Sequence, residues 1–178
     1  KKLLKNPTSI SLAISKPAAG ITQTAYMCHD SQKVNLAREI LKTKGKNLSH
    51  VLIFASSIKS VREIKRTLNK AGMRASEMHS GLDQNERENT IRDFKNKKIR
   101  ILVATDILSR GIDIKEIELV INYEVPHDAE DYVHRIGRTA RADRTGEAIT
   151  FINQKQVRNF KDIEKLIEKE VPKLKLPK

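Results

Sequence analysis

Short apolar runs rich in β-branched residues alternate along this chain with amphipathic segments at helical spacing. A run that is apolar on both faces is typical of a strand inside a parallel sheet, because helices cover both sides of such a sheet. Alternating strands and helices also favour right-handed βαβ crossovers. We therefore predict an α/β fold, a parallel β-sheet sandwiched by helices. The predicted strands are residues 25–30, 50–57, 74–79, 99–105, 119–125 and 146–152.

The segments between the predicted strands have the signals of helix ends. The predicted helices cover residues 32–44, 59–72, 83–94, a stretch after residue 128, and 155–171. Ser31, Asp83 and Asp128 are candidate N-caps, because their side-chain oxygens can accept a hydrogen bond from the free amides of a first turn. Glu86 follows Asp83 by three residues and predicts a capping box. Gly72 is the candidate stop of the second helix.

The last helix has an apolar stripe formed by Val157, Phe160, Ile163, Ile167 and Val171. Packing of this stripe on the core is the simpler interpretation, and a partner-binding surface is the alternative. The chain then divides into an extended interdomain linker at residues 1–22, one α/β domain at 23–153, and a C-terminal helix with a basic tail at 154–178. Because the chain begins with Lys1 rather than Met, we expect a fragment of a longer protein.

The charge of the chain favours a polyanionic partner. Lys and Arg outnumber Asp and Glu by 35 to 22, which gives a net charge of +13. Long-range attraction and counterion release favour nucleic acid over an anionic membrane, and a solvated Lys-rich surface is the alternative. No apolar run reaches the length of a bilayer span and no signal-peptide pattern opens the chain. We therefore expect no membrane partner.

The cysteine and histidine content argues against disulfides and metals. Cys28 is the single cysteine, so an internal disulfide is impossible, and a reducing cytoplasmic location is expected. Its strand-like surroundings predict a small buried hydrophobe rather than a reactive thiol. The five histidines show no ligand spacing with Cys or carboxylates. No metal site is predicted.

Polar segments follow the predicted strands where a ligand site would form. In open parallel sheets, ligands bind beyond the carboxyl ends of the strands. The segments expected there are residues 55–60, 79–87, 104–114 and 132–144. We expect these four segments to lie together along the carboxyl-end edge of the sheet, which is called the rim.

Residues 104–114, "ATDILSRGIDI", place a hydroxyl, carboxylates and a guanidinium at a strand end. Thr105 and nearby backbone amides could bind a phosphate, and Gly111 would allow close approach. A carboxylate of this segment, which contains Asp106 and Asp113, could accept hydrogen bonds from ribose hydroxyls. A polar turn that contains a structural pair between Arg110 and an aspartate is the alternative.

Residues 132–144, "YVHRIGRTARADR", carry arginines at positions 135, 138, 141 and 144. Steps of three residues place them on one side of a helix, and arginine binds phosphate through a planar fork. A solvated basic helix face is the alternative. The chain lacks the GxxxxGK[ST] loop that holds nucleotide phosphates, and "KTKGKNL" fails to match it. These are therefore candidate arginine fingers without the active site that they would reach.

Together these segments resemble the C-terminal RecA-like domain of a bacterial-type DEAD-box ATP-dependent RNA helicase of superfamily two. The resemblance covers about residues 24–153. "VLIFASS" is similar to motif IV of this family, "QNER" supplies its Gln-x-x-Arg, "VATDILSRGIDI" matches motif V, and "YVHRIGRTAR" matches motif VI. One such motif is weak, whereas four in the right order are highly specific.

The resemblance implies roles for individual residues. Arg138 and Arg141 would be arginine fingers on the γ-phosphate of ATP, with His134 and Arg135 bracing the contact to the other lobe. Asp113 would touch the ATP ribose beside Gly111, and Arg110 would couple the nucleotide and RNA sites. The residues expected to hold the RNA sugar-phosphate chain are Ser56, Ser80, Gly81, Arg87 and Thr105. The N-terminal RecA-like lobe would hold ATP with its Mg²⁺ ion.

The chain departs from the usual family pattern at Ala140, Asp143 and Ser80, where glycine is common. An added methyl at Ala140 should leave the fingers in place, whereas Asp143 adds a carboxylate near Arg141. Aromatic residues make up 4% of the chain and Trp is absent, so RNA binding should depend on phosphates and 2′-hydroxyls more than on base stacking. The alternatives to a helicase lobe are a non-catalytic nucleic-acid-binding module and a DNA translocase of the same superfamily.

Overall fold

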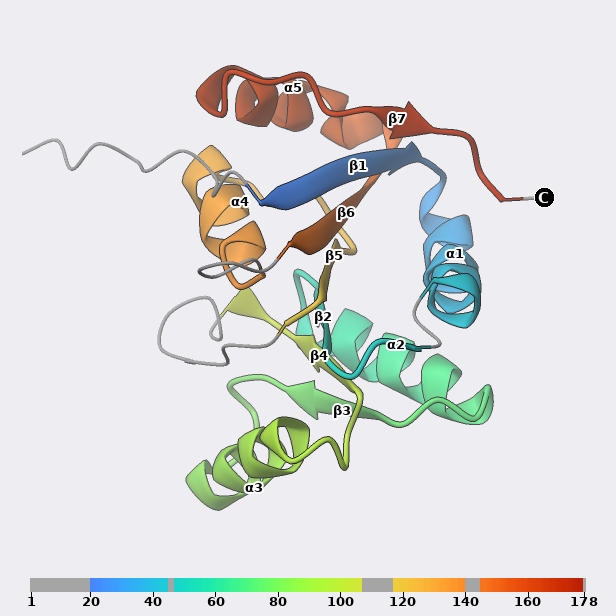
Figure 1. Ribbon diagram of the computed structural model, residues 1–178, viewed down its shortest axis with the longest axis vertical. Coiled ribbons are helices and arrows are strands. Elements are labelled where there is room, and N and C mark those ends of the chain that lie inside the picture. Colours follow the sequence, from blue (N-terminus) through green and yellow to red (C-terminus); the bar gives the residue numbers. More distant parts are fainter. Residues whose placement is uncertain (1–19, 45–46, 107–116, 140–144, 178) are drawn as a thin grey trace, which may run out of the picture.

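A computed structural model describes residues 20–44, 47–106, 117–139 and 145–177. Within these ranges the chain forms one sheet of seven strands, in the order β3-β4-β2-β5-β6-β1-β7 (Figure 1). All neighbouring strands are parallel, as predicted. The strands are β1 (Ile21–Met27), β2 (Val51–Phe54), β3 (Ala75–Met78), β4 (Ile101–Ala104), β5 (Leu119–Asn122), β6 (Gly146–Ile152) and β7 (Lys173–Leu174).

Three neighbouring interior strands, β4, β2 and β5, show that the sheet is covered on both faces. Every residue of β2, β4 and β5 is buried, because helices exclude water from both sides of such a sheet. The first strand was predicted to start at residue 25 but begins at Ile21, and it pairs with β6 along its whole length. The short strand β7 was not predicted; two residues are too few to show a hydrophobic period.

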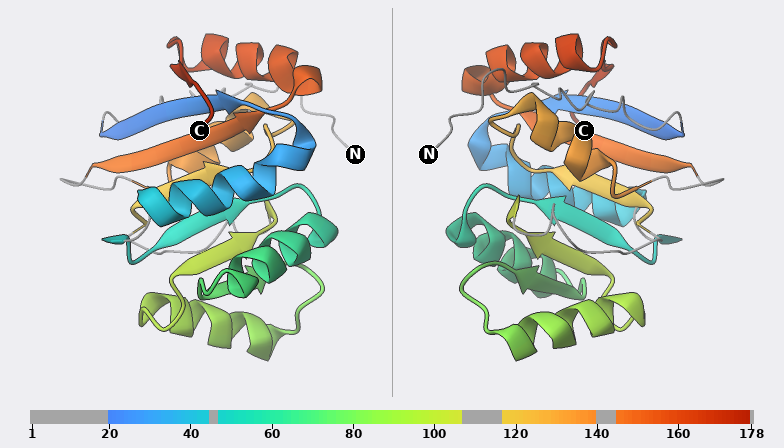
Figure 2. Two further views of the ribbon diagram at one scale, coloured as in Figure 1. Left: turned by 90° about the vertical axis from the view of Figure 1, so that its right-hand side faces the viewer. Right: turned by 90° about the vertical axis from the view of Figure 1, so that its left-hand side faces the viewer.

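Helices α1 (Asp30–Thr43) and α2 (Ile58–Lys70) cover one face of the sheet (Figure 2, left). The prediction that Ser31 caps α1 is wrong: the helix begins at Asp30, and the His29 amide donates to Gln32 Oε1 at 2.9 Å. Ser57 caps α2 by accepting a hydrogen bond from the Ser60 amide. The chain leaves α2 through Gly72, whose φ of +76° lies in the left-handed region that glycine tolerates.

The other face is covered by three helices (Figure 2, right), namely α3 (Gln84–Lys95), α4 (Ala129–Ile136) and α5 (Val157–Leu166), with a 3-10 turn, η3 (Gln154–Gln156), before α5. The predicted capping box of Asp83 and Glu86 is confirmed. Asp128 occupies the N-cap of α4 but makes no side-chain capping bond. The last helix ends at Leu166, earlier than predicted, and residue Glu168 has a φ of 52°.

The predicted docking role of the last helix is confirmed. Phe160, Ile163, Ile167 and Val171 are buried and belong to one core cluster with residues of α4, β1 and β6. Cys28 is also buried, and this burial raises the pKa of its thiol above the usual value. Among the described residues, no helix is both long and apolar enough to cross a bilayer.

Candidate functional site

The carboxyl ends of four strands lie in line at one edge of the sheet. Backbone hydrogen bonds continue between the segments just past the strands: the Thr105 amide donates to Met78 O at 3.1 Å, and the Ala55 amide donates to Ala104 O at 2.9 Å. The Tyr123 amide similarly donates to Phe54 O. These bonds place the first residues after β2, β3 and β4 side by side, and this part of the predicted rim is confirmed.

The arginine segment reaches the rim through Arg135 in the last turn of α4. Its guanidinium donates two hydrogen bonds to the Asp106 carboxylate, from Nε to Oδ1 at 2.6 Å and from Nη2 to Oδ2 at 2.8 Å. Nη1 donates to Asn122 Oδ1 and to Glu124 O, each at 3.3 Å. The side chain of Arg135 therefore ties α4 to the ends of β4 and β5.

Arg135 is 2% exposed, although the resemblance implied a contact with another lobe. Its guanidinium carbon lies 5.2 Å from the centre of the Phe54 ring, and Asn122, which accepts from it, donates in turn to Thr150 Oγ1 at 3.2 Å. All of these partners belong to this lobe, and a bidentate, charge-assisted contact of this kind fixes the geometry of the groups that it joins. Asn122 was not predicted as a site residue. The available signal was an asparagine at the end of the apolar run "LVIN".

The residues after Arg135 present the first candidate finger. The Nε of Arg138 donates to His134 O at 3.3 Å, one helical turn earlier, and His134 is exposed, with Nδ1 at 4.0 Å from Asp131 Oδ1. Thr139 is buried, and its hydroxyl donates to Ile117 O at 2.6 Å. Thr139 thus anchors the chain directly after Arg138 to Ile117, two residues before β5.

Several predicted site residues lie outside the described ranges. They are Arg110, Gly111, Asp113 and Arg141, together with Ala140, Asp143 and Arg144. Within residues 104–106, the Thr105 hydroxyl is buried and has no hydrogen-bond partner among the described residues. A buried hydroxyl without a partner is costly, so this atom is suited to a ligand that arrives at the rim.

The turn after β3 holds two of the residues predicted to bind RNA, Ser80 and Gly81, and a third, Arg87, contacts this turn from α3. His79 is fully buried, and its Nδ1 accepts a hydrogen bond from the Gly81 amide at 3.1 Å. Arg87 on α3 donates from Nη2 to Ser80 O at 3.0 Å, while its buried Nε has no partner among the described residues. Arg87 and the Ser80–Gly81 backbone therefore form one unit at the rim.

Ser56 lies on the rim between β2 and α2. Its amide donates to Glu124 Oε2 at 2.8 Å, and its side chain is exposed. The same Glu124 provides the carbonyl that accepts from Arg135. The structure thus brings Ser56, Ser80, Gly81, Arg87 and Thr105 to one edge, next to the segment that contains Arg135 and Arg138.

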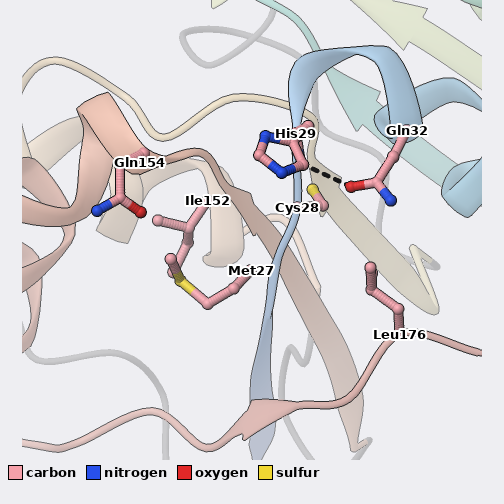
Figure 3. Close-up of a pocket in the computed structure, with 7 residues that line it drawn as sticks. All are labelled: Met27, Cys28, His29, Gln32, Ile152, Gln154 and Leu176. Carbon is pink, nitrogen blue, oxygen red and sulfur yellow. Dashed lines mark hydrogen bonds between the residues drawn. The ribbon is translucent and has the colours of Figure 1, made fainter.

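A separate pocket of about 280 Å³ lies at the ends of β1 and β6 (Figure 3). It is lined by Met27, Cys28, His29, Gln32, Ile152, Gln154 and Leu176. None of these residues belongs to the predicted site. Among the described residues, no group of three or more His, Cys, Asp or Glu side chains is arranged to hold a metal ion.

The sequence of this chain is similar to a known family and to known proteins. The model of the family described as "Helicase conserved C-terminal domain" matches residues 32–143. The ATP-dependent RNA helicase DBP8 of Scheffersomyces stipitis is 41% identical over 132 residues, which are 74% of this chain and 30% of that protein.

Solved structures agree with the sequence comparison. The crystal structure of a DEAD box protein from the hyperthermophile Methanococcus jannaschii matches with a TM-score of 0.81 and 38% identity, over 88% of this chain and 42% of that one. The structure of Dbp5 from S. cerevisiae bound to RNA and ADP BeF3 matches with a TM-score of 0.79 and 29% identity, over 86% of this chain and 41% of that one. The chain spans less than half the length of these proteins.

Proposed function

This chain belongs to the family of the helicase conserved C-terminal domain and is the C-terminal RecA-like lobe of a DEAD-box helicase, and we propose that it works with a second lobe to couple ATP hydrolysis to RNA remodelling. In this proposal the second, N-terminal RecA-like lobe binds ATP and its Mg²⁺ ion. The present chain supplies arginines to the nucleotide and half of the RNA-binding surface.

The observation that carries this proposal is the fork between Arg135 and Asp106. It fixes the helix that carries Arg138 against the rim, which supports a site where cationic groups contact a nucleotide and polar groups contact RNA at one edge. Relatives named as ATP-dependent RNA helicases, and a similar fold solved with RNA and ADP BeF3, support the same assignment.

RNA binds to the rim mainly through its sugar-phosphate chain. The Nε of Arg87 and the hydroxyl of Thr105, which have no hydrogen-bond partner among the described residues, provide hydrogen-bond donors for phosphate or ribose oxygens. The exposed Ser56 and the turn at Ser80 and Gly81 provide further polar groups. These groups read no base edges, so the binding is largely independent of sequence.

Closure of the two lobes brings Arg138 and Arg141 to the γ-phosphate. Water attacks the γ-phosphorus and loses a proton to solvent, and the bond to the oxygen that bridges the β- and γ-phosphates breaks, so that ADP leaves with this oxygen. The two guanidinium groups stabilise the charge on the transferring oxygens, an effect of about 10³ to 10⁵ in rate. Asp113 and Gly111 contact the nucleotide, and Arg110 links it to the RNA site. The closed state bends one RNA strand and opens the duplex locally, and phosphate release resets the lobes.

The test compares ATP turnover by this chain alone with turnover by a protein in which it is joined to its N-terminal lobe. We expect the chain alone to be silent and the two-lobed protein to be stimulated by single-stranded RNA. Arg138→Lys in the two-lobed protein should lower turnover by about 10³-fold or more and change RNA affinity by less than about twofold. Arg158→Lys, at an exposed position on α5, is the matched control.

Other outcomes would contradict the proposal. If Arg138→Lys weakened RNA binding as much as it lowered turnover, the arginines would bind RNA themselves, and the chain would be a basic binding module. If DNA stimulated turnover as strongly as RNA, a DNA translocase would replace the RNA helicase.

A further inference from the structure

Helix α2 exposes a strip of basic side chains along its whole length. Lys59, Arg62, Arg66 and Lys70 fall within about 80° of arc at 100° per residue, and all four are exposed. The buried residues of the helix, Val61, Ile64 and Leu68, lie on the opposite side. The strip thus points away from the sheet, and it is hereafter called the α2 strip.

Carboxylates neutralise only part of the α2 strip. Arg62 lies 3.9 Å from Glu77 Oε2, and the neighbouring Lys65 lies 3.2 Å from Glu77 Oε1. Among the described residues, no carboxylate lies within ion-pairing distance of Lys59, Arg66 or Lys70. Residues 58–78 contain six Lys or Arg and two Glu, so the surface keeps a net positive charge that attracts anions.

The α2 strip starts at the rim. Lys59 lies in the first turn of α2, two residues after the N-cap Ser57 and three after Ser56. The strip also meets the turn after β3 through Glu77, whose Oε2 lies 3.5 Å from Nε2 of His79. Because Nδ1 of His79 accepts from the Gly81 amide, a neutral His79 carries its proton on Nε2, toward Glu77.

Grooves border the α2 strip on the molecular surface. One of about 520 Å³ is lined by Arg62, Lys65, Arg66, Asn69, Lys70 and Glu77. A neighbouring one of about 480 Å³ is lined by Ile58, Lys59, Arg62, Glu63 and Arg66. From Lys59 to Lys70 the strip is about 16 Å long at 1.5 Å per residue. This length matches about four or five phosphates of one strand in a duplex.

We propose that the α2 strip binds the phosphate backbone of RNA that continues beyond the rim. The proposal rests on the proposed function, because it assumes that RNA lies along the rim past Ser56. The strip then holds the flanking part of the same RNA by charge and without base recognition. It would keep a long or structured RNA bound while the rim contacts a few nucleotides.

The side chains of the α2 strip favour RNA over other anionic partners. Protein interfaces and membrane surfaces use apolar anchors, and among the described residues the exposed large apolar side chains are Met27 and Leu174. Met27 lies in β1 and Leu174 in β7, at the end of the sheet opposite β3. Aromatic residues are absent from α2, so bases cannot stack there and phosphates are the available contact.

The test uses the triple variant Lys59→Gln, Arg66→Gln and Lys70→Gln, which leaves the contacts of Glu77 intact. Fluorescence anisotropy measures the affinity of this chain for two RNAs, one of about 6 nucleotides that fits the rim and one extended to about 16 nucleotides. We expect the variant to bind the short RNA normally and the long RNA about five- to tenfold more weakly. The slope of log affinity against log salt for the long RNA should fall by about 2.

Two further variants separate this proposal from the proposed function. Arg158→Gln, Lys161→Gln and Lys169→Gln remove the same charge from the α5 region, and should leave the affinity of the long RNA within about twofold. If the α2 variant bound the long RNA no more weakly than this control, the strip would be only a solvated face and the proposal would be wrong. In that case Arg87→Gln tests the rim separately. If this variant binds the short RNA more weakly than the unchanged chain does, the rim binds RNA and the proposed function stands.

Discussion

The guanidinium of Arg135 and the carboxylate of Asp106 form a two-bonded fork, at 2.6 and 2.8 Å, between residues that are 29 positions apart in the sequence. Arg135 is nearly inaccessible, whereas the side chain of Asp106 is 46% exposed. Asp106 is the last described residue of the segment after β4. The fork thus holds the start of that segment against α4.

Arg135→Lys should destabilise this chain and disturb the rim. A lysine amine cannot reproduce the planar fork, and its charge would remain buried with fewer partners, so we expect a loss of about 2 kcal/mol in the free energy of unfolding. Urea unfolding followed by circular dichroism measures this loss. Arg158→Lys on the exposed face of α5 is the control and should change stability by less than about 0.5 kcal/mol. Equal stability of the two variants would argue against the fork as a structural tie.

Thr139→Val tests whether the anchor after Arg138 matters for the nucleotide step. Valine keeps the shape but removes the hydroxyl that donates to Ile117 O at 2.6 Å, and it leaves that carbonyl without this donor. We expect stability to fall by about 1 to 2 kcal/mol. In the two-lobed protein, ATP turnover should fall more than RNA affinity, because the altered anchor adjoins Arg138. Equal losses in turnover and RNA affinity would place the effect in the whole lobe instead.

Asp30→Asn should show a pH-dependent loss of stability. Hydrogen bonds from Lys33 and Asn153 lower the pKa of the Asp30 carboxyl, and Lys33 is buried with its amine 2.8 Å from Asp30 Oδ1. A carboxyl with a lowered folded pKa contributes stability above its unfolded pKa of about 3.9 and loses it as pH falls through the folded pKa. Because Asp30 is largely exposed, the expected loss at pH 7 is about 1 kcal/mol.

Urea unfolding of Asp30→Asn at several pH values checks this expectation. The difference from the unchanged chain should shrink as the pH falls below about 3.9. Asp162→Asn, which breaks a more exposed pair with Lys165 at 3.4 Å, is the control, with a difference near zero. If the difference for Asp30→Asn stayed constant with pH, the loss of stability would come from packing and not from the charge of the carboxylate.

Local patterns predicted those elements whose signals lie close together in the chain. Asp83 and Glu86 are three residues apart and reveal their capping box directly. The start of α1 was misplaced because His29, which is not a usual cap, precedes Asp30, and because Gln32 supplies the hydrogen bond. The early start of β1 was missed because Ile21 and Thr22 gain strand structure by pairing with Gly146 and Glu147, far along the chain.

Local sequence patterns were sufficient to predict the parallel α/β class, the order of strands and helices along the chain, and the polar segments that follow the strands. Each of these depends on hydrophobic period or on neighbouring residues, which a single chain displays directly. The tertiary structure was needed to show that Arg135 is buried on Asp106 and that Asn122 accepts a hydrogen bond from it. Those relationships join distant segments, and their geometry exists only once the sheet has brought the strand ends together.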